Sequence, residues 1–139
     1  MVFNNSFSKN LDLLHRSLDV SVLRYNVIAN NIANSETPNF KRSKVNFEAE
    51  LMRALDAESP KRAFPVSFRY NKEDYFFKPG DYRDVKPRVV LDYLTTAKNN
   101  GNNVDIDEEM MNAMTTQLMY QAMLYTVNSE FHRVNLVLR

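Results

Sequence analysis

Apolar residues recur at alternating steps of four and three along the N-terminal part of the chain. The pattern starts after Phe7 and ends at Ile32, and the opposite positions are polar, for example Arg16 and Asp19. Such a heptad spacing, with a period of about 3.5, is typical of a helix that packs along a partner. We predict an N-terminal helix whose contact row comprises Leu11, Leu14, Leu18, Tyr25, Ile28 and Ile32, with Ser21 as its polar member.

The C-terminal part repeats this spacing over a longer distance. Its predicted helix of about 35 residues would be roughly 50 Å long. Asp105 stands at an N-cap position, and Glu108 completes a capping-box-like pattern. Asp107 and Glu109 add negative charge at the positive end of the helix dipole. The contact row comprises Ile106, Met110, Ala113, Gln117, Tyr120, Leu124, Val127, Phe131, Val134 and Leu138, and a second apolar row comprises Met111, Met114, Leu118, Ala122 and Tyr125.

The segment between the two helices changes from helical to alternating periodicity. Residues 46–58 predict a short helix with Asn46 as its cap, because apolar residues recur on one face. Apolar and polar residues alternate over 64–70, which is typical of a half-buried strand, and 85–91 predict a returning strand. A proline–glycine pair within 78–82 predicts a turn between them.

These elements predict a mainly α-helical chain. Long N- and C-terminal helices form a coiled-coil-like pair, and the central segment holds one short helix and a small β-hairpin-like region. The expected organisation is an N-terminal assembly helix over residues 1–34, a central segment over 35–103 and a C-terminal assembly helix over 104–139. A compact chain of this length has a radius of gyration of only about 14 Å, so the last helix would project from a globule.

Composition excludes several classes of function. The 18 basic and 17 acidic residues nearly cancel, so neither a polyanion nor an anionic membrane is indicated as a partner. Cysteine is absent, which excludes disulfides and thiolate chemistry, and two glycines are too few for a glycine-rich phosphate loop. No run approaches the roughly 20 apolar residues that span a bilayer. The N-terminus also lacks the charged and apolar regions of a cleaved signal peptide.

Few side chains suggest catalytic or metal chemistry. His15 and His132 stand on opposite terminal helices and could share a metal if these pair antiparallel, but no acidic residue stands at a helical i±3 or i±4 spacing from both. A position on a helix face is the simpler interpretation. The acidic residues of 105–109 are explained by capping and by the helix dipole. We therefore expect no enzyme, no metal site and no cofactor.

Two further patterns each have two interpretations. Lys41, Arg42 and Lys44 follow the first helix and could contact nucleic acid. Flanking glutamates and the near-neutral charge favour a solvated turn, so no nucleic-acid partner is expected. Most of the seven methionines lie on the last helix. They are either core filler or a packing face that adapts to slightly different neighbours, since thioether side chains are flexible.

Two stretches of the sequence resemble a known family. Residues 29–42, ANNIANSETPNFKR, resemble the N-terminal signature of the bacterial flagellar axial proteins, the rod and hook family. Residues 101–123, GNNVDIDEEMMNAMTTQLMYQAM, resemble the C-terminal stretch of the B-type proximal-rod subunits within that family. The resemblance covers roughly residues 8–55 and 99–139, and 59–97 match no family pattern.

The resemblance implies a structural subunit of the proximal rod of the flagellar basal body. Such subunits assemble through their terminal helices with copies of themselves and with other rod proteins, contact the adaptor at the membrane ring and carry motor torque for motility. They leave the cell through the flagellar type III export apparatus without a cleaved signal peptide, and the rod spans the periplasm. Phe3 and Phe7 have the spacing of the apolar export signal. The alternative function is a cytoplasmic coiled-coil adaptor or regulator that binds one helical partner.

The N-terminal motif predicts a sharp turn. We expect the first helix to end near residues 33–34, because Thr37 precedes Pro38 and is driven from helical angles. Asn39 replaces the usual glycine and tolerates a left-handed conformation, and Phe40 replaces the usual tyrosine. The asparagines bind backbone groups either within the turn or on a neighbouring subunit. The motif comprises Asn30, Asn31, Ile32, Ala33, Asn34, Thr37, Pro38, Asn39 and Phe40.

Overall fold

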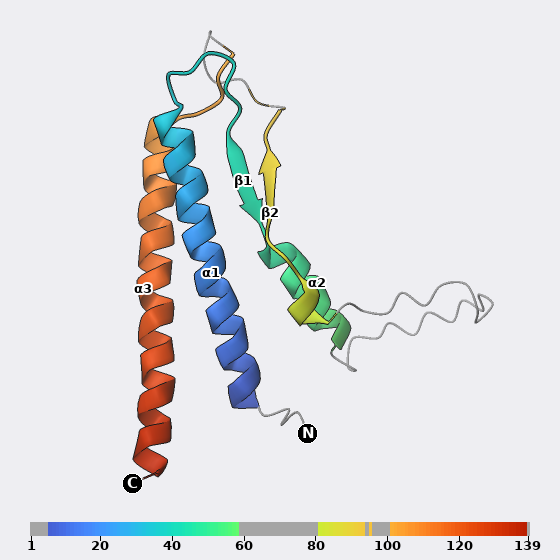
Figure 1. The fold of residues 1–139 in the computed structure, drawn as a ribbon, viewed down its shortest axis with the longest axis vertical. Coiled ribbons are helices and arrows are strands. Elements are labelled where there is room, and N and C mark those ends of the chain that lie inside the picture. Colours follow the sequence, from blue (N-terminus) through green and yellow to red (C-terminus); the bar gives the residue numbers. More distant parts are fainter. Residues whose placement is uncertain (1–5, 59–80, 94, 96–100, 139) are drawn as a thin grey trace, which may run out of the picture. The chain divides into compact units, whose positions relative to one another are not determined.

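The computed structural model describes residues 6–58, 81–93, 95 and 101–138 (Figure 1). Two long helices, α1 (Ser6–Ala33) and α3 (Ile106–Val137), run antiparallel and pack against each other. The predicted mainly α-helical fold with long terminal helices is therefore confirmed. The elements between them are β1 (Ser43–Asn46), α2 (Glu48–Glu58), the 3-10 helix η2 (Tyr82–Asp84) and β2 (Arg88–Leu91).

The end of α1 follows the expected turn. The helix ends at Ala33, and three successive backbone hydrogen bonds, from Ser35 to Ile32, Thr37 to Asn34 and Phe40 to Thr37, turn the chain over. Asn39 has a φ of 60°, the left-handed conformation that was predicted for it. The turn therefore tolerates asparagine where the family pattern has glycine.

The start of α3 is capped as predicted. The Asp105 carboxylate accepts hydrogen bonds from the amide groups of Asp107, at 3.0 Å, and Glu108, at 3.4 Å. The Glu108 carboxylate does not complete a capping box by turning back to the cap. It forms an ion pair with Arg42, at 2.9 Å.

The face of α3 that packs on α1 differs in part from the predicted contact row. Its buried residues are Glu109, Thr116 and Val127. Since α1 is the element that packs along α3 within the described residues, these positions mark the shared interface. Of the predicted row, Val127 is buried and Ala113, Tyr120 and Val134 are half-buried, whereas Met110, Leu124 and Phe131 are 56%, 38% and 46% exposed.

The predicted contact row on α1 is buried more evenly than the row on α3. Ile28 and Ser21 are buried, as is Val20 beside the predicted row, and Tyr25 is 48% exposed. The hydroxyls of Ser17 and Ser21 donate to the carbonyls four residues earlier. Polar side chains thus occupy much of the helix–helix interface. The remaining members of the row, all half-buried, are Leu11, Leu14, Leu18 and Ile32.

β1 and β2 form a two-stranded antiparallel sheet, which Figure 1 shows as two opposed arrows. The predicted returning strand is present, but its partner is residues 43–46, a stretch too short for period-two alternation to reveal it. The alternating stretch 64–70 and most of the turn 78–82 lie outside the described residues. Asn46 was predicted to cap α2, which is wrong, because Asn46 ends β1 and the helix starts at Glu48.

The chain divides into two compact units, residues 1–45 with 89–139 and residues 46–88. In the second unit α2 contacts η2, Phe47 and Tyr82 are buried, and the Arg83 guanidinium lies 5.4 Å from the centre of the Tyr82 ring. All the residues of the candidate site belong to the first unit.

Candidate functional site

The two motifs meet beside the C-terminal end of α1, where Asn102 is completely buried. Its side-chain Nδ2 donates to the carbonyl oxygens of Asn34, Ser35 and Thr37, at 3.2, 2.9 and 3.1 Å. Its Oδ1 accepts a hydrogen bond from the Val104 amide at 2.7 Å. Helix-terminal carbonyls lack intrahelical partners, so Asn102 caps α1 across a separation of 68 residues from Asn34.

The residues on either side of Asn102 add further contacts. The Asn103 Oδ1 accepts a hydrogen bond from the Arg42 amide at 2.7 Å, and its Nδ2 donates to the Asp92 carbonyl at 2.7 Å. The Lys41 ammonium donates to the Gly101 carbonyl at 2.8 Å. Gly101 has a φ of +77°, and a Cβ there would lie 2.7 Å from the Asn39 Oδ1. The positive φ therefore favours glycine at position 101, and a larger residue would also displace the Asn39 side chain.

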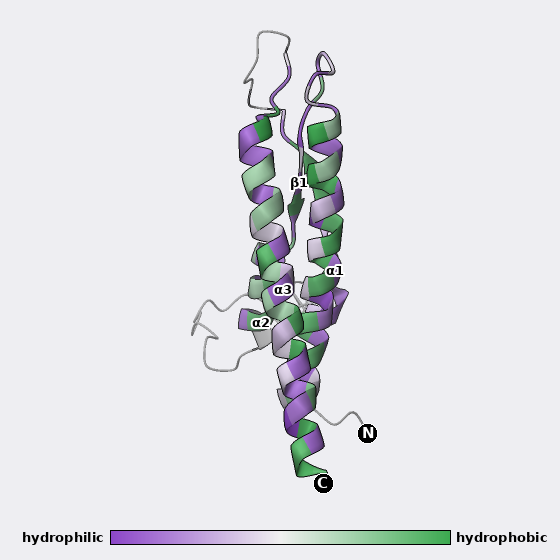
Figure 2. Cartoon of the chain, turned by 90° about the vertical axis from the view of Figure 1, so that its left-hand side faces the viewer, coloured by the Kyte–Doolittle hydropathy of each residue, from purple (hydrophilic) through white to green (hydrophobic). Residues whose placement is uncertain are grey.

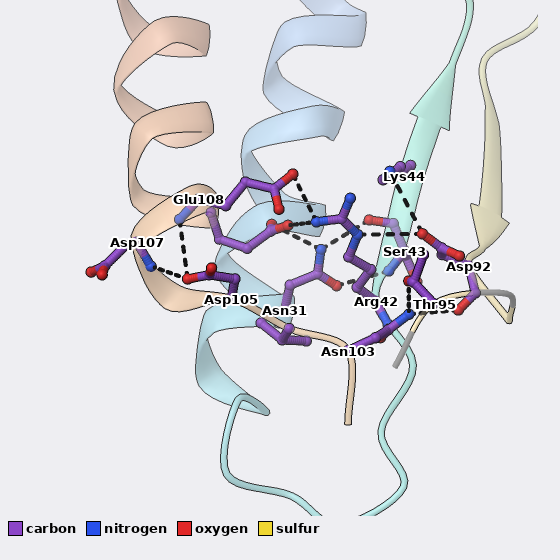
Figure 3. Close-up of polar contacts among 12 residues, drawn as sticks. Asn31, Arg42, Ser43, Lys44, Asp92, Thr95, Asn103, Asp105, Asp107 and Glu108 are labelled. Carbon is purple, nitrogen blue, oxygen red and sulfur yellow. Dashed lines mark hydrogen bonds and ion pairs between the residues drawn. The ribbon is translucent and has the colours of Figure 1, made fainter. Parts of the chain in front are cut away.

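Asn31 joins α1 to both the sheet and α3 (Figure 3). Its Nδ2 donates to the Ser43 carbonyl at 2.9 Å, and its Oδ1 accepts from the Ser43 amide at 3.0 Å. The same Nδ2 donates to the Glu109 carboxylate at 3.0 Å. This amide therefore satisfies both backbone groups of Ser43, as a neighbouring strand would.

Arg42 lies among three carboxylates and is 7% exposed. Its guanidinium is 2.9 Å from Glu108, 3.5 Å from Glu109 and 3.5 Å from Asp92. Burial by itself lowers the pKa of Arg42, but the hydrogen bond that Arg42 donates to Glu108 and the three negative charges outweigh it and raise the pKa. Arg42 is therefore charged at any ordinary pH. The expectation of a solvated turn at this position is wrong, because the carboxylates draw the side chain inward.

We call this cluster the asparagine junction. Its amides, carboxylates and guanidinium bind one another or nearby backbone groups, although the buried Arg42 Nε forms only an ion pair with Asp92, at 3.5 Å. Nothing in the cluster is poised as a nucleophile or a general base. In the described part of the chain no group of three or more His, Cys, Asp or Glu residues could hold a metal ion. The junction therefore holds two helices and a sheet in register. Its members are Asn31, Arg42, Asn102, Asn103 and Glu109.

The turn-motif asparagines find their partners within the chain. The Asn34 Nδ2 donates to the Asn30 carbonyl at 2.8 Å and to the Asn30 Oδ1 at 3.0 Å. Asn31 binds Ser43 and Glu109, as described. Both asparagine side chains therefore stabilise their own subunit.

Sequence reasoning missed the junction residues that come from the C-terminal motif, namely Asn102, Asn103 and Glu109. The acidic residues after Asp105 were assigned to the helix dipole, yet Glu109 is 3% exposed and binds Asn31 and Arg42. The available signal was the Asn102-Asn103 pair next to a glycine, because a turn of this kind rarely needs two adjacent amides unless they bind backbone groups elsewhere.

The apolar side chains of α3 that do not face α1 form a second feature. Each helix residue turns by about 100°, so a position two residues from a buried one lies on nearly the opposite face. No charged residue occurs from Met110 to Ser129. Green bands recur along α3 in Figure 2. We call four of these side chains the outer row; they are Met111, Met114, Leu118 and Tyr125, which are 71%, 66%, 56% and 78% exposed.

The other predicted site residues belong neither to the asparagine junction nor to the outer row. His15 and His132 are both exposed. Phe7 is half-buried in a hollow that it shares with Val134 and Val137 near the end of α3. Phe3 lies outside the described residues. Among those described, no helix is long and apolar enough to cross a membrane.

Comparison with known proteins identifies the family. The family model described as "Flagella basal body rod protein" matches residues 23–41, which include the whole turn motif. The flagellar basal body rod protein FlgB of Borrelia hermsii is 50% identical over 137 residues, which cover 97% of this chain and 99% of the relative. FlgB of Borreliella burgdorferi is 45% identical, covering 97% and 99%, and FlgB of Bacillus subtilis is 34% identical, covering 95% of each. Because these relatives match nearly from end to end, the chain belongs to the FlgB family of flagellar basal body rod proteins.

Proposed function

We propose that the chain assembles with copies of itself and with other rod proteins through its terminal helices and transmits motor torque. The family is one of structural rod subunits and not of enzymes. Within that setting residues 1–34 and 104–139 act as assembly helices, and the central segment 35–103 faces outward. The adaptor at the membrane ring is the proposed neighbour on one side.

The observation that carries this proposal is the exposed apolar surface of α3. Leu118 and Tyr125 of the outer row are 56% and 78% exposed on a helical stretch without charge from Met110 to Ser129. Contiguous apolar surface of this kind marks protein–protein contacts in soluble proteins. The asparagine junction supports the torque-bearing role, because it fixes α1 against α3 by several buried hydrogen bonds and an ion-pair network.

The proposed route to this location is the flagellar type III export apparatus, without a cleaved signal peptide. Phe7 packs against the last turns of α3 in the folded chain. An export signal at Phe3 and Phe7 therefore requires that the chain be unfolded when the apparatus binds it. The rod subunit would then fold as it joins the rod across the periplasm.

The experiment is complementation of a strain that lacks the gene. We expect Leu124→Lys to abolish swimming and to remove the protein from purified basal bodies, because Leu124 is 38% exposed on α3 and a charge there cannot be covered by a neighbour. The protein should still be exported. Met52→Lys, at an α2 residue that is 62% exposed, is the matched control and should restore swimming.

A soluble chain that never fractionates with basal bodies would contradict the proposal and favour the cytoplasmic adaptor. Full swimming with Leu124→Lys would contradict the assignment of the predicted α3 contact row, to which Leu124 belongs, to assembly. Immunoblotting of the culture medium separates a failure of export from a failure of assembly.

A further inference from the structure

A hollow opens between α1 and α3 near the middle of the helix pair. Its volume is about 240 Å³, and a cavity of about 150 Å³ already holds a benzene-sized ring. It therefore has room for one leucine or methionine side chain. We call this hollow the socket; it is lined by Ser21, Val22, Tyr25, Thr116, Gln117 and Tyr120.

The floor of the socket offers no free hydrogen-bond donor. Ser21 and Thr116 are each 5% exposed, and their hydroxyls donate to the carbonyls of Ser17, at 2.8 Å, and Asn112, at 2.7 Å. Both side chains are small, so the two helices leave a gap above them. An apolar side chain can therefore fill this gap without leaving the Ser21 or Thr116 hydroxyl unpaired.

The walls of the socket are neutral. Val22 and Tyr25 of α1 are 49% and 48% exposed, and Gln117 supplies the one side-chain amide among the described residues of the lining. In the part of the chain that the structure describes, no charged side chain lines the hollow. An occupant must therefore present an apolar side chain from a surface that is itself uncharged, because an approaching charge would be desolvated without a partner.

The outer row of the same chain meets these requirements. Leu118 and Met114 project from a helical stretch without charged residues and have the size that the socket accepts. Leu118 lies about 100° around α3 from Gln117, so the outer row and the socket face different directions. One copy can therefore offer its outer row to a second copy while its own socket remains available. Such a heterologous contact propagates as an open helical array.

We propose that the socket of one copy receives an outer-row side chain, with Leu118 at its centre, from a second copy of this chain. The inference rests on the proposed assembly function and names the contact through which copies meet. It predicts that Val22 of one copy lies next to Leu118 of its neighbour. Leu118 residues of two copies should not lie next to each other.

The chain has no cysteine, so engineered pairs can test the contact directly. Val22→Cys and Leu118→Cys would be carried by two differently tagged copies that are produced together in cells lacking the gene. A disulfide requires Cα atoms within about 7 Å. Oxidised basal bodies should therefore contain a covalent dimer that carries both tags. Neither variant produced alone should give one.

Asp19→Cys is the matched control for Val22→Cys. Asp19 is also exposed on α1 but does not line the socket. Combined with Leu118→Cys, it should give no dimer above background. The same mixtures of purified chains, oxidised at increasing concentration, give a second measurement that does not depend on incorporation into basal bodies.

Several outcomes would overturn the inference. One is the absence of a two-tag dimer from both measurements while both tagged proteins fractionate with basal bodies. Another is an equal yield with Asp19→Cys. Dimers of Leu118→Cys alone would show that outer rows meet each other, and a cross-link to a different protein would place another helix in the socket. In all these cases the rod function stands, whereas a wild-type chain absent from basal bodies contradicts the rod function itself.

Discussion

The Asn102 side chain does what few other residues could do at its position. Its amide nitrogen is directed at three carbonyls, and its oxygen accepts from the Val104 amide. An aspartate could accept but not donate, and a leucine could do neither. Of these three carbonyls, those of Asn34 and Thr37 also accept a backbone hydrogen bond, whereas the carbonyl of the buried Ser35 relies on the Asn102 amide.

Replacing Asn102 should be costly for stability. We expect Asn102→Ala to lower the free energy of unfolding by about 1–3 kcal/mol, the usual cost of leaving buried groups without partners. Asn102→Asp should cost more, because a carboxylate would face three carbonyl oxygens. The urea midpoint, followed by circular dichroism, measures the change. Asn10→Ala, at an exposed position of α1, should leave the midpoint in place. Equal midpoints for all three variants would remove the capping role.

At the scale of elements, the junction ties β1 to the start of α3. Arg42 stands immediately before β1 and pairs with Glu108 and Glu109 in the first turn of α3. Glu109 is 3% exposed, so its charge depends on Arg42 for compensation. The pKa of Arg42 is raised in the folded chain, so its stabilising charge is present at low and neutral pH and is lost only as the pH rises through that high pKa.

Removing Arg42 should show how far the buried Glu109 carboxylate depends on its positive charge. We expect Arg42→Ala to cost about 3–5 kcal/mol, because it leaves buried carboxylates without a counter-charge. The double variant Arg42→Ala with Glu109→Gln should recover part of the loss, since glutamine is neutral and can still accept from Asn31. Thermal unfolding of the two variants and the wild type measures the recovery. A double variant no more stable than Arg42→Ala would contradict the pairing.

The elements differ in how far their sequence predicts them. The two helices, the end of α1 and the Asp105 cap follow from periodicity and turn chemistry, which are local signals. The face of α3 that meets α1 cannot be predicted from these local signals. Apolar side chains surround that helix, so periodicity does not distinguish among its faces. Arg42 was assigned to a solvated turn and Glu109 to the helix dipole, since burial of a charge depends on partners that are distant in sequence. The β1–β2 pairing was missed for the same reason.

At the scale of the first unit, packing quality changes along the helix pair. One end carries the junction, whose members Asn31, Asn102 and Asn103 are at most 3% exposed. The other end has a hollow of about 270 Å³ beside Phe7, and Val137 is 85% exposed there. The two ends therefore differ in the number of contacts that would be lost on opening.

Hydrogen exchange should show this gradient. We expect amides of 28–35 and 104–113 to exchange slowest and those of 7–14 and 130–137 to exchange fastest, because local opening is cheapest where little surface is buried. Mass spectrometry of the purified chain at low concentration measures it peptide by peptide. Asn102→Ala should accelerate exchange near residues 28–35 more than at the distal ends. Uniform protection along both helices would contradict the expected gradient.

The capping of α1 by Asn102 also sets an order of events in time. A ribosome, or any channel that passes the chain from its N-terminus, releases α1 long before residue 102. During that interval the carbonyls of Asn34, Ser35 and Thr37 lack the Asn102 amide, and the Arg42 amide lacks the Asn103 side chain. Closing so large a loop is entropically unfavourable and occurs late. In a truncated chain that ends before Gly101 this loop cannot close. Only subunits that include the later residues therefore acquire the folded junction.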